Sequence, residues 1–472
     1  MRITWLLFFI VATGCTKPNP NLCCTDEADC ASAGLAVGTS CDDGLVCRGN
    51  QCIAELCASS AECEASAPYC VINGDGRCQE ACTADSECPG FGQSPAQQYC
   101  EAGSCVQCRS DADCDATTPV CSGGACRGCE AHDECATGAC HADGTCAVEA
   151  EIAHVSLTGS ATADCTLASP CSTIERTFQL TPARHYVLIE PGTYTRASTL
   201  DVNGIHHLIG HGGKPIITRS TQGPIVTSAS GGVDVTFENL EISGAKGPAT
   251  GDLTSGWGVR CNPTSGAPIL RFYDTAISAN SYIGVDMRNG CSIEAVRSSI
   301  SNNGNIGLSV TDGSATLESC SVVQNAFLGV HLDIGAFDIT NSIIARNGNT
   351  GLDLFTTTTG TRVEHNTIAD NAGTGFNCSL QGITGTFPNN IIARNTTQLT
   401  GLNCTYPSSI IVDTDVAPIK FVSPNTAPFD YHIAAGSIAV DVANPSAIDH
   451  DIDGDARPQG AGRDVGADEL TP

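Results

Sequence analysis

Four side chains suited to acid–base chemistry occupy equivalent positions of a repeated pattern in the second half of this 472-residue chain. Each one directly follows a glycine and an apolar residue: Arg260, Asp286, His331 and Asp353. Carboxyl and imidazole groups can donate or accept protons in catalysis, and glycoside hydrolysis uses a pair of carboxyl groups. We therefore treat these four residues as the candidate catalytic set. The same position in the other repeats holds Ser309, Asn377 and Asn403.

The spacing of these candidates argues against catalysis. If each repeat contributes one strand to a stack, neighbouring members of the column lie ~4.8 Å apart. Asp286 and Asp353 are three repeats apart, so roughly 14 Å separates their backbones, which is wide for a pair of glycosidase carboxyl groups. We therefore expect a solvated or ligand-binding face and no enzymatic activity. A polysaccharide lyase or glycoside hydrolase on the same scaffold is the alternative.

The pattern that positions the candidates also predicts the fold. An asparagine recurs at steps of 22–24 residues, and apolar residues alternate with polar ones after each glycine, which is the period of a β-strand. Like residues at constant spacing indicate stacked turns, and this period fits three short strands per turn. The sequence predicts an all-β parallel β-helix, defined by Asn280, Asn303, Asn325, Asn347, Asn371 and Asn395 and by pairs beginning at Gly258, Gly284, Gly307, Gly329, Gly351, Gly375 and Gly401.

The asparagine column has a physical explanation. In consecutive turns each side-chain amide can bond to the amides above and below it. Asparagine also tolerates the left-handed backbone conformation that tight bends require. We therefore predict a ladder of side-chain hydrogen bonds along one corner of the β-helix.

Six of the seven cysteines after residue 149 can be paired. Cys378 and Cys404 occupy the same inward position in successive repeats, close enough for a disulfide. Cys165 and Cys171 are expected to cross-link the N-terminal end of the β-helix. Cys320 has no partner, and we expect a buried thiol without chemistry. The predicted disulfides are Cys165–Cys171, Cys261–Cys291 and Cys378–Cys404.

The segment VLIEPGTY at Val187–Tyr194 resembles the first turns of pectin-lyase-like β-helix proteins. The resemblance implies a right-handed parallel β-helix. Enzymes of that class use an outward strand face, with acidic Ca²⁺ ligands and, in the lyases, an arginine or lysine base. This chain lacks the paired-aspartate and His-Gly signatures of the polygalacturonases. Tyr282 and Phe327 share a column near the candidates, where they could hold a sugar ring.

The C-terminal segment resembles the choice-of-anchor Q type tail of many bacterial right-handed β-helix repeat proteins. The motifs that carry the resemblance are Tyr431–Ser437, Asp453-Gly454, Arg457-Pro458 and Asp464–Glu469. The resemblance implies a closing segment of the fold and a surface location, with no catalytic role.

Alternating carboxylates precede Gly454 in this tail and suit a hard cation such as Ca²⁺. The run lacks the bidentate glutamate of an EF-hand, so we favour a structural acidic turn over a metal site. We expect no cofactor, with Ca²⁺ as the alternative; its candidate ligands are Asp449, Asp451, Asp453 and Asp455.

Residues 23–146 contain 22 of the 30 cysteines. The spacing C-x5-C occurs five times, always with Asp or Glu before the second cysteine, and two further cysteines close each unit. Such units are too small to bury a core, so disulfides must stabilise them. Four cysteines allow three pairings, and the sequence does not choose among them. Cys105, Cys108, Cys126 and Cys129 also have zinc-like spacing, but so many cysteines favour disulfides.

The cysteine content indicates an exported protein. Arg2, the apolar run 3–11 and Cys15 resemble a bacterial lipoprotein signal, which implies that Cys15 is lipidated and that the protein is anchored in the outer membrane. A net charge of −29 argues against nucleic acid as a partner.

These observations predict the following organisation: a signal peptide at 1–15, a tether at 16–22, a cysteine-rich stalk at 23–148, a β-helix at 149–420 and a closing segment at 421–472. We expect a monomeric, surface-exposed lipoprotein that displays the β-helix for adhesion, glycan binding or contact with a surface protein.

Overall fold

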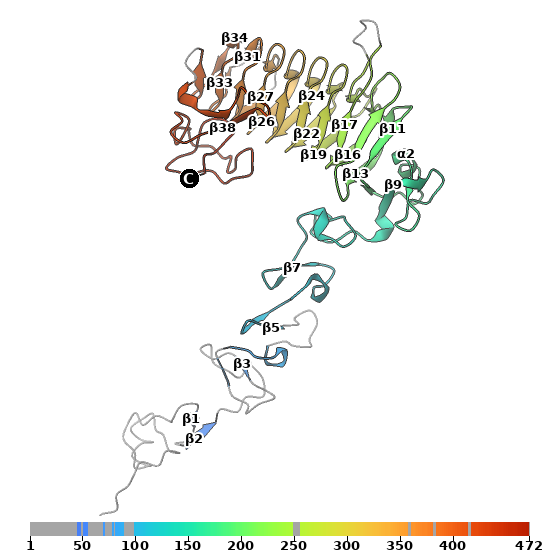
Figure 1. Ribbon diagram of the computed structural model, residues 1–472, viewed down its shortest axis with the longest axis vertical. Coiled ribbons are helices and arrows are strands. Elements are labelled where there is room, and N and C mark those ends of the chain that lie inside the picture. Colours follow the sequence, from blue (N-terminus) through green and yellow to red (C-terminus); the bar gives the residue numbers. More distant parts are fainter. Residues whose placement is uncertain are drawn as a thin grey trace, which may run out of the picture. The chain divides into compact units, whose positions relative to one another are not determined.

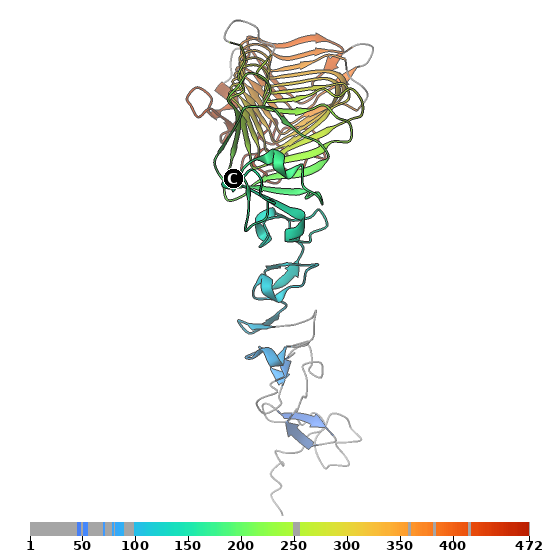
Figure 2. The ribbon, with the colours of Figure 1, turned by 90° about the vertical axis from the view of Figure 1, so that its right-hand side faces the viewer.

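The computed structural model describes residues 45–48, 51–54, 69–70, 78–79, 81–88, 99–248, 255–356, 360–380, 384–413 and 417–471. The chain divides into two compact units, Met1–Ala147 and Val148–Pro472. The second unit is a stack of parallel strands (Figure 1, Figure 2). The predicted all-β parallel β-helix is therefore confirmed.

Each full turn of the β-helix contributes three strands, as the period predicts. Strands of the first and second columns belong to one 16-stranded sheet, because the long strands β24 and β26 run through both columns. The first column comprises β12 (Leu200–Asp201), β15 (Val226–Ser228), β18 (Val259–Cys261), β21 (Val285–Arg288), the first halves of β24 (Leu308–Glu318) and β26 (Val330–Thr340), β28 (Leu352–Leu354), β31 (Thr374–Ser379) and β34 (Thr397–Leu402).

The second column begins next to a short N-terminal cap, which contains η5 (Glu149–Glu151) and α2 (Ile174–Thr177). It comprises β9 (Ile152–Ser160), β10 (Tyr186–Ile189), β13 (Ile205–Gly210), β16 (Asp234–Glu238), β19 (Ile269–Tyr273), β22 (Ser292–Val296), the second halves of β24 and β26, and β29 (Arg362–Glu364).

The third column is a separate 10-stranded sheet. It comprises β11 (Thr193–Arg196), β14 (Ile216–Arg219), β17 (Glu241–Ser243), β20 (Ala276–Ser278), β23 (Ser299–Ser301), β25 (Ser321–Val323), β27 (Ile343–Ala345), β30 (Thr367–Ala369), β33 (Ile391–Ala393) and β36 (Ile410–Val412).

Inward side chains of all three columns form one continuous apolar core. The first-column core positions are fully buried, and Phe237 stacks on Phe272 of the next turn with ring centroids 5.2 Å apart. Each buried side chain of this size contributes roughly 1.5–3 kcal/mol by leaving water. The column of residues after the repeated glycines is Val259, Val285, Leu308, Val330, Leu352 and Phe376.

The predicted asparagine ladder is confirmed. Each amide nitrogen before Asn395 donates to the amide oxygen of the next turn, as from Asn303 to Asn325 (2.9 Å) and from Asn325 to Asn347 (3.0 Å). The last one, from Asn395, donates to the side chain of Gln398. Every member is buried. One detail of the prediction is wrong: the left-handed residue is the one before each asparagine, for example Gln324 at φ 58°. The asparagine therefore points inward while its neighbour makes the bend.

A second polar ladder runs along the corner between the second and third columns, and the sequence analysis did not predict it. Its members are small polar side chains that accept the N–H or bond to a carbonyl of a neighbouring turn, as when Ser342 accepts the N–H of Cys320. Cys320 occupies one place in it, and its thiol donates to the carbonyl of Ala295. The column is Thr275, Ser298, Cys320, Ser342, Asn366, Asn390 and Ser409.

The three disulfides of the β-helix join Cys165 to Cys171, Cys261 to Cys291 and Cys378 to Cys404, and Cys320 is a buried free thiol. The positional argument for the last pair is wrong, because Cys378 stands opposite Gly401 of β34. Cys404 belongs to β35 (Cys404–Thr405), which pairs with β32 (Gly385–Thr386).

The C-terminal segment covers the outward face of the third column at its last turns. It contains η6 (Ala417–Ile419) and an antiparallel pair, β37 (Phe421–Ser423) and β38 (Asp430–Ile433). Apolar residues of the segment pack on Ile343, Ala345, Ile391 and Ala393, so strands β27 and β33 are buried on both faces.

A buried ion pair holds this segment together. Arg457 lies 3.0 Å from Glu469, and both side chains are almost fully excluded from solvent. The same guanidinium donates to the carbonyls of Asp464 and Gly466, and Glu469 accepts backbone N–H groups from Asp464 and Gln459. Because every polar group is paired, the ion pair avoids the desolvation penalty of an isolated charge.

Where it is described, the first unit consists of short hairpins with little regular structure. The strands and 3₁₀ helices of these described residues are β1 (Leu45–Arg48), β2 (Gln51–Ala54), β3 (Tyr69–Cys70), β4 (Cys78–Gln79), η2 (Asp85–Glu87), β5 (Tyr99–Glu101), β6 (Ser104–Val106), η3 (Asp111–Asp113), β7 (Val120–Ser122), β8 (Ala125–Arg127) and η4 (His132–Glu134).

In the last three four-cysteine repeats, whose disulfides are described, the first cysteine pairs with the third and the second with the fourth. The structure thus selects one of the three pairings that the sequence allowed. The pairs are Cys82–Cys100, Cys88–Cys105, Cys108–Cys121, Cys114–Cys126, Cys129–Cys140 and Cys135–Cys146. The other cysteines of residues 23–146 lie outside the residues whose side chains are described.

The acidic residue before each second cysteine has a structural role. Its carboxylate accepts the N–H of the residue that follows the first cysteine, which closes the 3₁₀ turn between them. In the last of the five repeats, the Arg127 guanidinium and two backbone N–H groups lower the pKa of Glu134 to about 2. The three bonds run from Thr83 to Glu87, Arg109 to Asp113 and Glu130 to Glu134.

Helices of the described residues are too short and polar to cross a bilayer. Cys15, the predicted lipidation site, and the signal and tether at 1–22 lie outside those residues.

Candidate functional site

The candidate catalytic residues stand side by side on the outward face of the first column. Arg260 is opposite Asp286, Asp286 is opposite Ser309, and the series continues through His331 and Asp353. The next members are Asn377 and then Thr400, so the predicted place of Asn403 in this column is wrong. In this last turn Leu399 stands opposite Phe376, so the pair Gly401-Leu402 lies three residues beyond the place that the repeated glycine-apolar pair takes in the earlier turns.

Asp286 is fully buried under two arginines. Nε of Arg288 lies 3.0 Å from both carboxylate oxygens, and Nε of Arg260 lies 3.8 Å from one of them. Burial raises the pKa of Asp286 above its usual value, and the two guanidinium groups counteract that rise. The carboxylate therefore serves as the anchor of a surface ion-pair cluster, and none of its surface faces solvent.

Asp353 is the centre of a hydrogen-bonded chain along the same column. One oxygen lies 2.9 Å from Nδ1 of His331, and the other accepts from the side-chain amide of Asn377 at 2.7 Å. The Asn377 oxygen in turn accepts from the Thr400 hydroxyl. Phe355 meets the His331 ring edge-on, with centroids 5.7 Å apart.

The two carboxylates of the column are therefore occupied by local partners. Three turns separate Asp286 from Asp353, and each is bonded within its own cluster. Neither is placed to act with the other as an acid and a nucleophile or base across a glycosidic bond. What the face offers is a row of hydrogen-bonding groups held in fixed positions, which suits binding more than proton transfer.

An aromatic and amide column lies at the bend just before the first-column strands. Backbone bonds link Tyr282 to Asn305, Asn305 to Phe327 and Phe327 to Asn349 in successive turns. Phe327 is 44% exposed. The predicted common column of Tyr282 and Phe327 is confirmed, and the two amides that alternate with them were missed. Their steps of 23, 22 and 22 residues match the repeat and could have revealed them.

Aromatic contacts continue this column at its N-terminal end. Trp257 meets Tyr282 edge-on at 5.5 Å, and the guanidinium of Arg260 lies over the Trp257 ring at 4.4 Å. A cation over an indole face is held by the ring quadrupole. Arg260 is thus engaged between Asp286 and Trp257, which accounts for the one basic candidate at this end.

The candidate Ca²⁺ ligands form an acidic turn. Asp451 is buried, one of its oxygens accepts the N–H groups of Asp453 and Asp455, and the other accepts the N–H of Glu469. Asp449 bonds to the ring of His450. Both carboxylate oxygens of Asp451 thus accept hydrogen bonds from backbone N–H groups, and neither is directed at a Ca²⁺ position shared with the other three aspartates.

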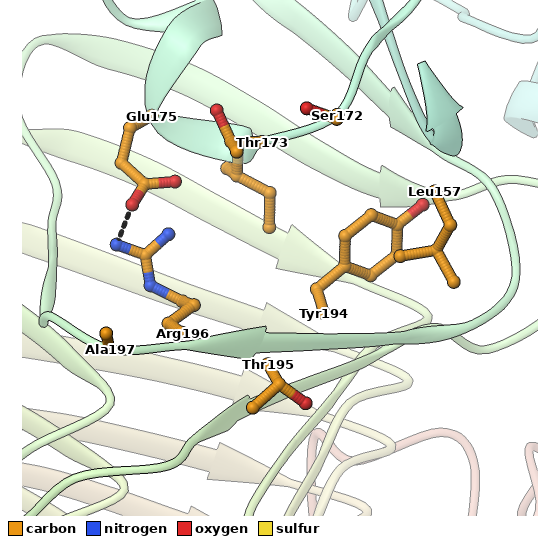
Figure 3. Close-up of a pocket in the computed structure, with 9 residues that line it drawn as sticks. Leu157, Ser172, Thr173, Glu175, Tyr194, Thr195, Arg196 and Ala197 are labelled. Carbon is orange, nitrogen blue, oxygen red and sulfur yellow. Dashed lines mark ion pairs between the residues drawn. The ribbon is translucent and has the colours of Figure 1, made fainter. Parts of the chain in front are cut away.

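A small cavity of about 240 Å³ lies beside the N-terminal cap. The Tyr194 hydroxyl donates there to backbone carbonyls, and Arg196 pairs with Glu175 (Figure 3). Arg196 is buried and also donates to the carbonyl of Thr199. Its polar groups join α2 to β11, so the cavity is part of the cap that closes the core.

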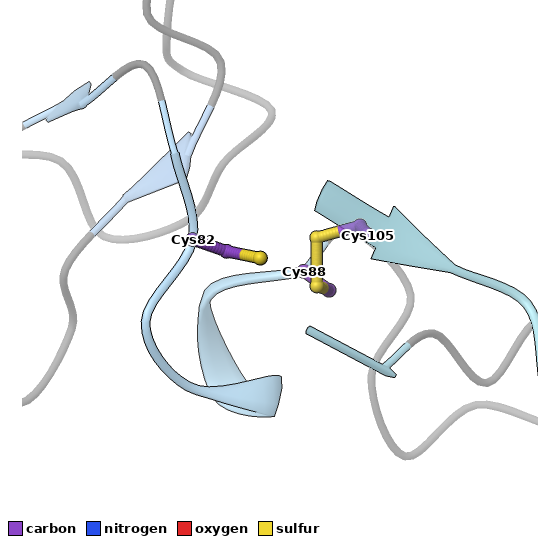
Figure 4. Close-up of side chains that lie close together, drawn as sticks. All are labelled: Cys82, Cys88 and Cys105. Carbon is purple, nitrogen blue, oxygen red and sulfur yellow. A yellow bond between two sulfur atoms is a disulfide. The ribbon is translucent and has the colours of Figure 1, made fainter. Parts of the chain in front are cut away.

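The zinc alternative in the cysteine-rich unit is wrong. Cys105, Cys108, Cys126 and Cys129 are each in a disulfide with a different partner. Sulfur atoms do lie close together in each described four-cysteine repeat, for example Cys82 beside the Cys88–Cys105 disulfide (Figure 4). Disulfide sulfurs lack the thiolate charge that binds zinc, so these clusters are covalent staples.

Comparisons with known proteins agree with this fold. Residues 283–416 match the family described as Right handed beta helix region. Among solved structures, the chain is similar to pectate lyase Pel9A, with 16% identity and a TM-score of 0.50 over 67% of this chain and 96% of that one. No curated protein matches the chain.

Two other structures are similar at lower scores. A rhamnogalacturonan lyase has 13% identity and a TM-score of 0.31 over 58% of this chain and 90% of its own. The A-module of mannuronan C-5 epimerase AlgE6 from Azotobacter vinelandii has 13% identity and a TM-score of 0.29 over 51% and 94%. The likeness to Pel9A, at 16% identity, shows the fold alone: Val148–Pro472 contains a right-handed, pectate-lyase-like parallel β-helix.

Proposed function

We propose that this protein is an exported, lipid-anchored protein of the bacterial cell envelope whose β-helix binds glycan without cleaving it. The observation that carries the proposal is the state of Asp286 and Asp353. Both carboxylates are bound to partners of their own, and three turns separate them. A face of this kind presents ordered hydrogen-bonding groups and lacks a converging pair of acids.

The aromatic and amide column supports a glycan as the ligand. Tyr282 and Phe327 are two turns apart, ~10 Å along the β-helix axis, with Asn305 between them. Aromatic rings pack against the apolar faces of sugars, while amides bond to hydroxyl groups. A polymer lying along the axis would meet such a pair at each two-turn step. The net charge of −29 favours a neutral or cationic polymer over an acidic one.

Glycan binding is tested with full-length protein on an array of neutral, cationic and acidic polysaccharides. We expect Tyr282→Ala and Phe327→Ala each to weaken binding of the best neutral or cationic glycan at least fivefold. Val422→Ala, which removes an exposed apolar side chain of β37, is the matched control and leaves binding unchanged. Binding that is equal in all four proteins would remove the column from the site.

A polysaccharide lyase or hydrolase is the second candidate, and the likeness to Pel9A in fold is what favours it. It is tested by incubating the same glycans with the protein and Ca²⁺, and measuring new reducing ends and unsaturated products. We expect neither product. Turnover that disappears in Asp286→Asn or Asp353→Asn would overturn the non-catalytic proposal.

The anchor is tested separately, because glycan binding does not depend on it. Cys15→Ser should move the protein from the membrane fraction to the soluble fraction and abolish incorporation of radioactive palmitate. Protease added to intact cells together with dithiothreitol should cut the reduced cysteine-rich region and release the β-helix if it faces outward. Unchanged membrane association of Cys15→Ser would refute lipidation.

A further inference from the structure

The C-terminal segment brings together three metal-ligating side chains that are far apart in the sequence. His432 belongs to β38, Asp453 to the acidic run just before Gly454, and Asp468 to the segment Asp464–Glu469. One ring nitrogen and one oxygen from each carboxylate all lie within 4.8 Å of one another. This cluster differs from the acidic turn around Asp451, whose oxygens are occupied by backbone N–H groups.

A fourth residue orients the histidine. Nδ1 of His432 lies 2.6 Å from Asp430, so the ring is fixed with Nε2 toward Asp453, 2.9 Å from its oxygen. A carboxylate on the second nitrogen is the usual support of a histidine that binds a metal. Within the described residues Nε2 is buried and has no hydrogen-bond partner, because the Asp453 oxygen lies off the direction of a hydrogen bond.

Asp468 supplies the second independent sign of a cation. Its side chain is only 7% exposed, and one oxygen accepts the N–H of Ile433 at 2.6 Å. A divalent ion at the cluster would compensate this unfavourable burial of negative charge.

We propose that His432, Asp453 and Asp468 bind a first-row divalent transition-metal ion, with Zn²⁺ as the ion of choice. One imidazole nitrogen and two carboxylate oxygens form a three-ligand set that zinc accepts, whereas Ca²⁺ prefers six or more oxygens. His432 and Asp453 also line an open cavity of about 800 Å³, so water or a ligand oxygen can complete the coordination. The ion joins β38 to the end of the chain.

The site is tested with the full-length protein and Zn²⁺ alone. Isothermal titration should detect one Zn²⁺ whose affinity falls at least tenfold in His432→Gln and in Asp453→Ala. Co²⁺ replaces Zn²⁺ as a spectroscopic probe, and its visible d–d bands, which report nitrogen and oxygen ligation, should disappear in both variants. Asp453 is exposed enough that its removal leaves the fold intact, which far-UV circular dichroism verifies.

His450→Gln is the matched control. His450 also lies between two carboxylates, 2.8 Å from Glu318 and 2.9 Å from Asp449, but each contacts a different ring nitrogen, so the three do not converge. We expect unchanged Zn²⁺ affinity in this variant. The proposal is overturned if Zn²⁺ binds equally to wild type, His432→Gln and Asp453→Ala, if His450→Gln loses as much affinity as they do, or if no Zn²⁺ binds at all.

Discussion

The two units of this chain solve the same problem of stability in opposite ways. In residues 81–147 the described apolar core is little more than disulfide sulfurs around Val120 and a few alanines. The β-helix buries one continuous column of apolar residues. At two of its corners, ladders of polar side chains form hydrogen bonds with the buried backbone groups and with one another. Covalent cross-links therefore replace burial where each repeat is too short to form a core.

The largest expected effect is the response of the two units to a reducing agent. Dithiothreitol should abolish the structure of the cysteine-rich unit, because six disulfides hold its described part. The β-helix should survive, because its core is apolar and two of its three disulfides, Cys165–Cys171 and Cys261–Cys291, are fully buried. Limited proteolysis with mass spectrometry checks this: fragments should begin near Val148 only after reduction. Equal protection of both units would break the comparison.

The next largest effect concerns the asparagine ladder. Asn325→Ala removes donors to the Ile300 carbonyl and to Asn347, and an acceptor for Asn303. Each buried group left unpaired costs about 1–3 kcal/mol, so the free energy of unfolding should fall by about 3–5 kcal/mol in urea titration. Gln324→Ala, at the exposed neighbouring position, is the control and should cost far less. Similar losses in both variants would contradict a structural role of the ladder.

A smaller effect should appear on acidification. His365 is fully buried, and burial with the charges of Arg457 and Arg463 lowers its pKa to about 3. The unfolded chain takes up a proton near pH 6.5 and the folded chain does not, so stability falls as the pH drops from 6.5 toward 3. This one group should cost about 2 kcal/mol by pH 5.

The contribution of His365 is isolated by difference, because other groups also titrate in this range. Unfolding of wild type and His365→Asn should be compared at pH 7 and pH 5. The variant keeps a side chain that tolerates the left-handed conformation at this position (φ 54°). Its stability should change less with pH than that of wild type; an identical change in both proteins would show that His365 is not the sensor.

The smallest effect is expected at the free thiol. Cys320 occupies a ladder place that Ser298 and Ser342 hold in the adjacent turns, so Cys320→Ser should change the free energy of unfolding by less than about 1 kcal/mol. Burial raises the pKa of the thiol to about 12, and iodoacetamide should not alkylate it in the folded protein. A large loss of stability, or rapid alkylation, would show that this place is not part of the polar ladder.

The columns that could be predicted from the sequence are those in which one residue type recurs in every turn. The asparagine column and the glycine-apolar pairs defined the strands, the core and the column of Asp286 and Asp353, because identical residues at constant spacing can be aligned by eye. The second ladder was not predicted because its members, such as Thr275, Ser298 and Cys320, share small size and hydrogen bonding but differ in residue type. Small size and hydrogen bonding at a buried corner are what its places require.

The predicted positions of Asn403 and Cys404 are wrong for another reason. Both were expected in the regular columns, but in the last turn Thr400 takes the outward position and Gly401 stands opposite Cys378. A period cannot report where the repeat stops. The grouping of His432 with Asp468 depends on a tail that folds back on the sheet, and no local spacing encodes that return.

The pairing of first with third and second with fourth cysteine has a mechanical consequence. A chain pulled at its ends is normally drawn out residue by residue. Between Cys82 and Cys105, however, tension can pass through six peptide units to Cys88 and then across a disulfide. The distance from Cys82 to Cys105 can therefore grow to only about 26 Å, the six peptide units plus the 5.6 Å between the Cα atoms of Cys88 and Cys105, whereas the fully extended peptide would span about 80 Å. Repeated three times in the described residues, this makes the segment resist stretching by shear or by a tethered ligand.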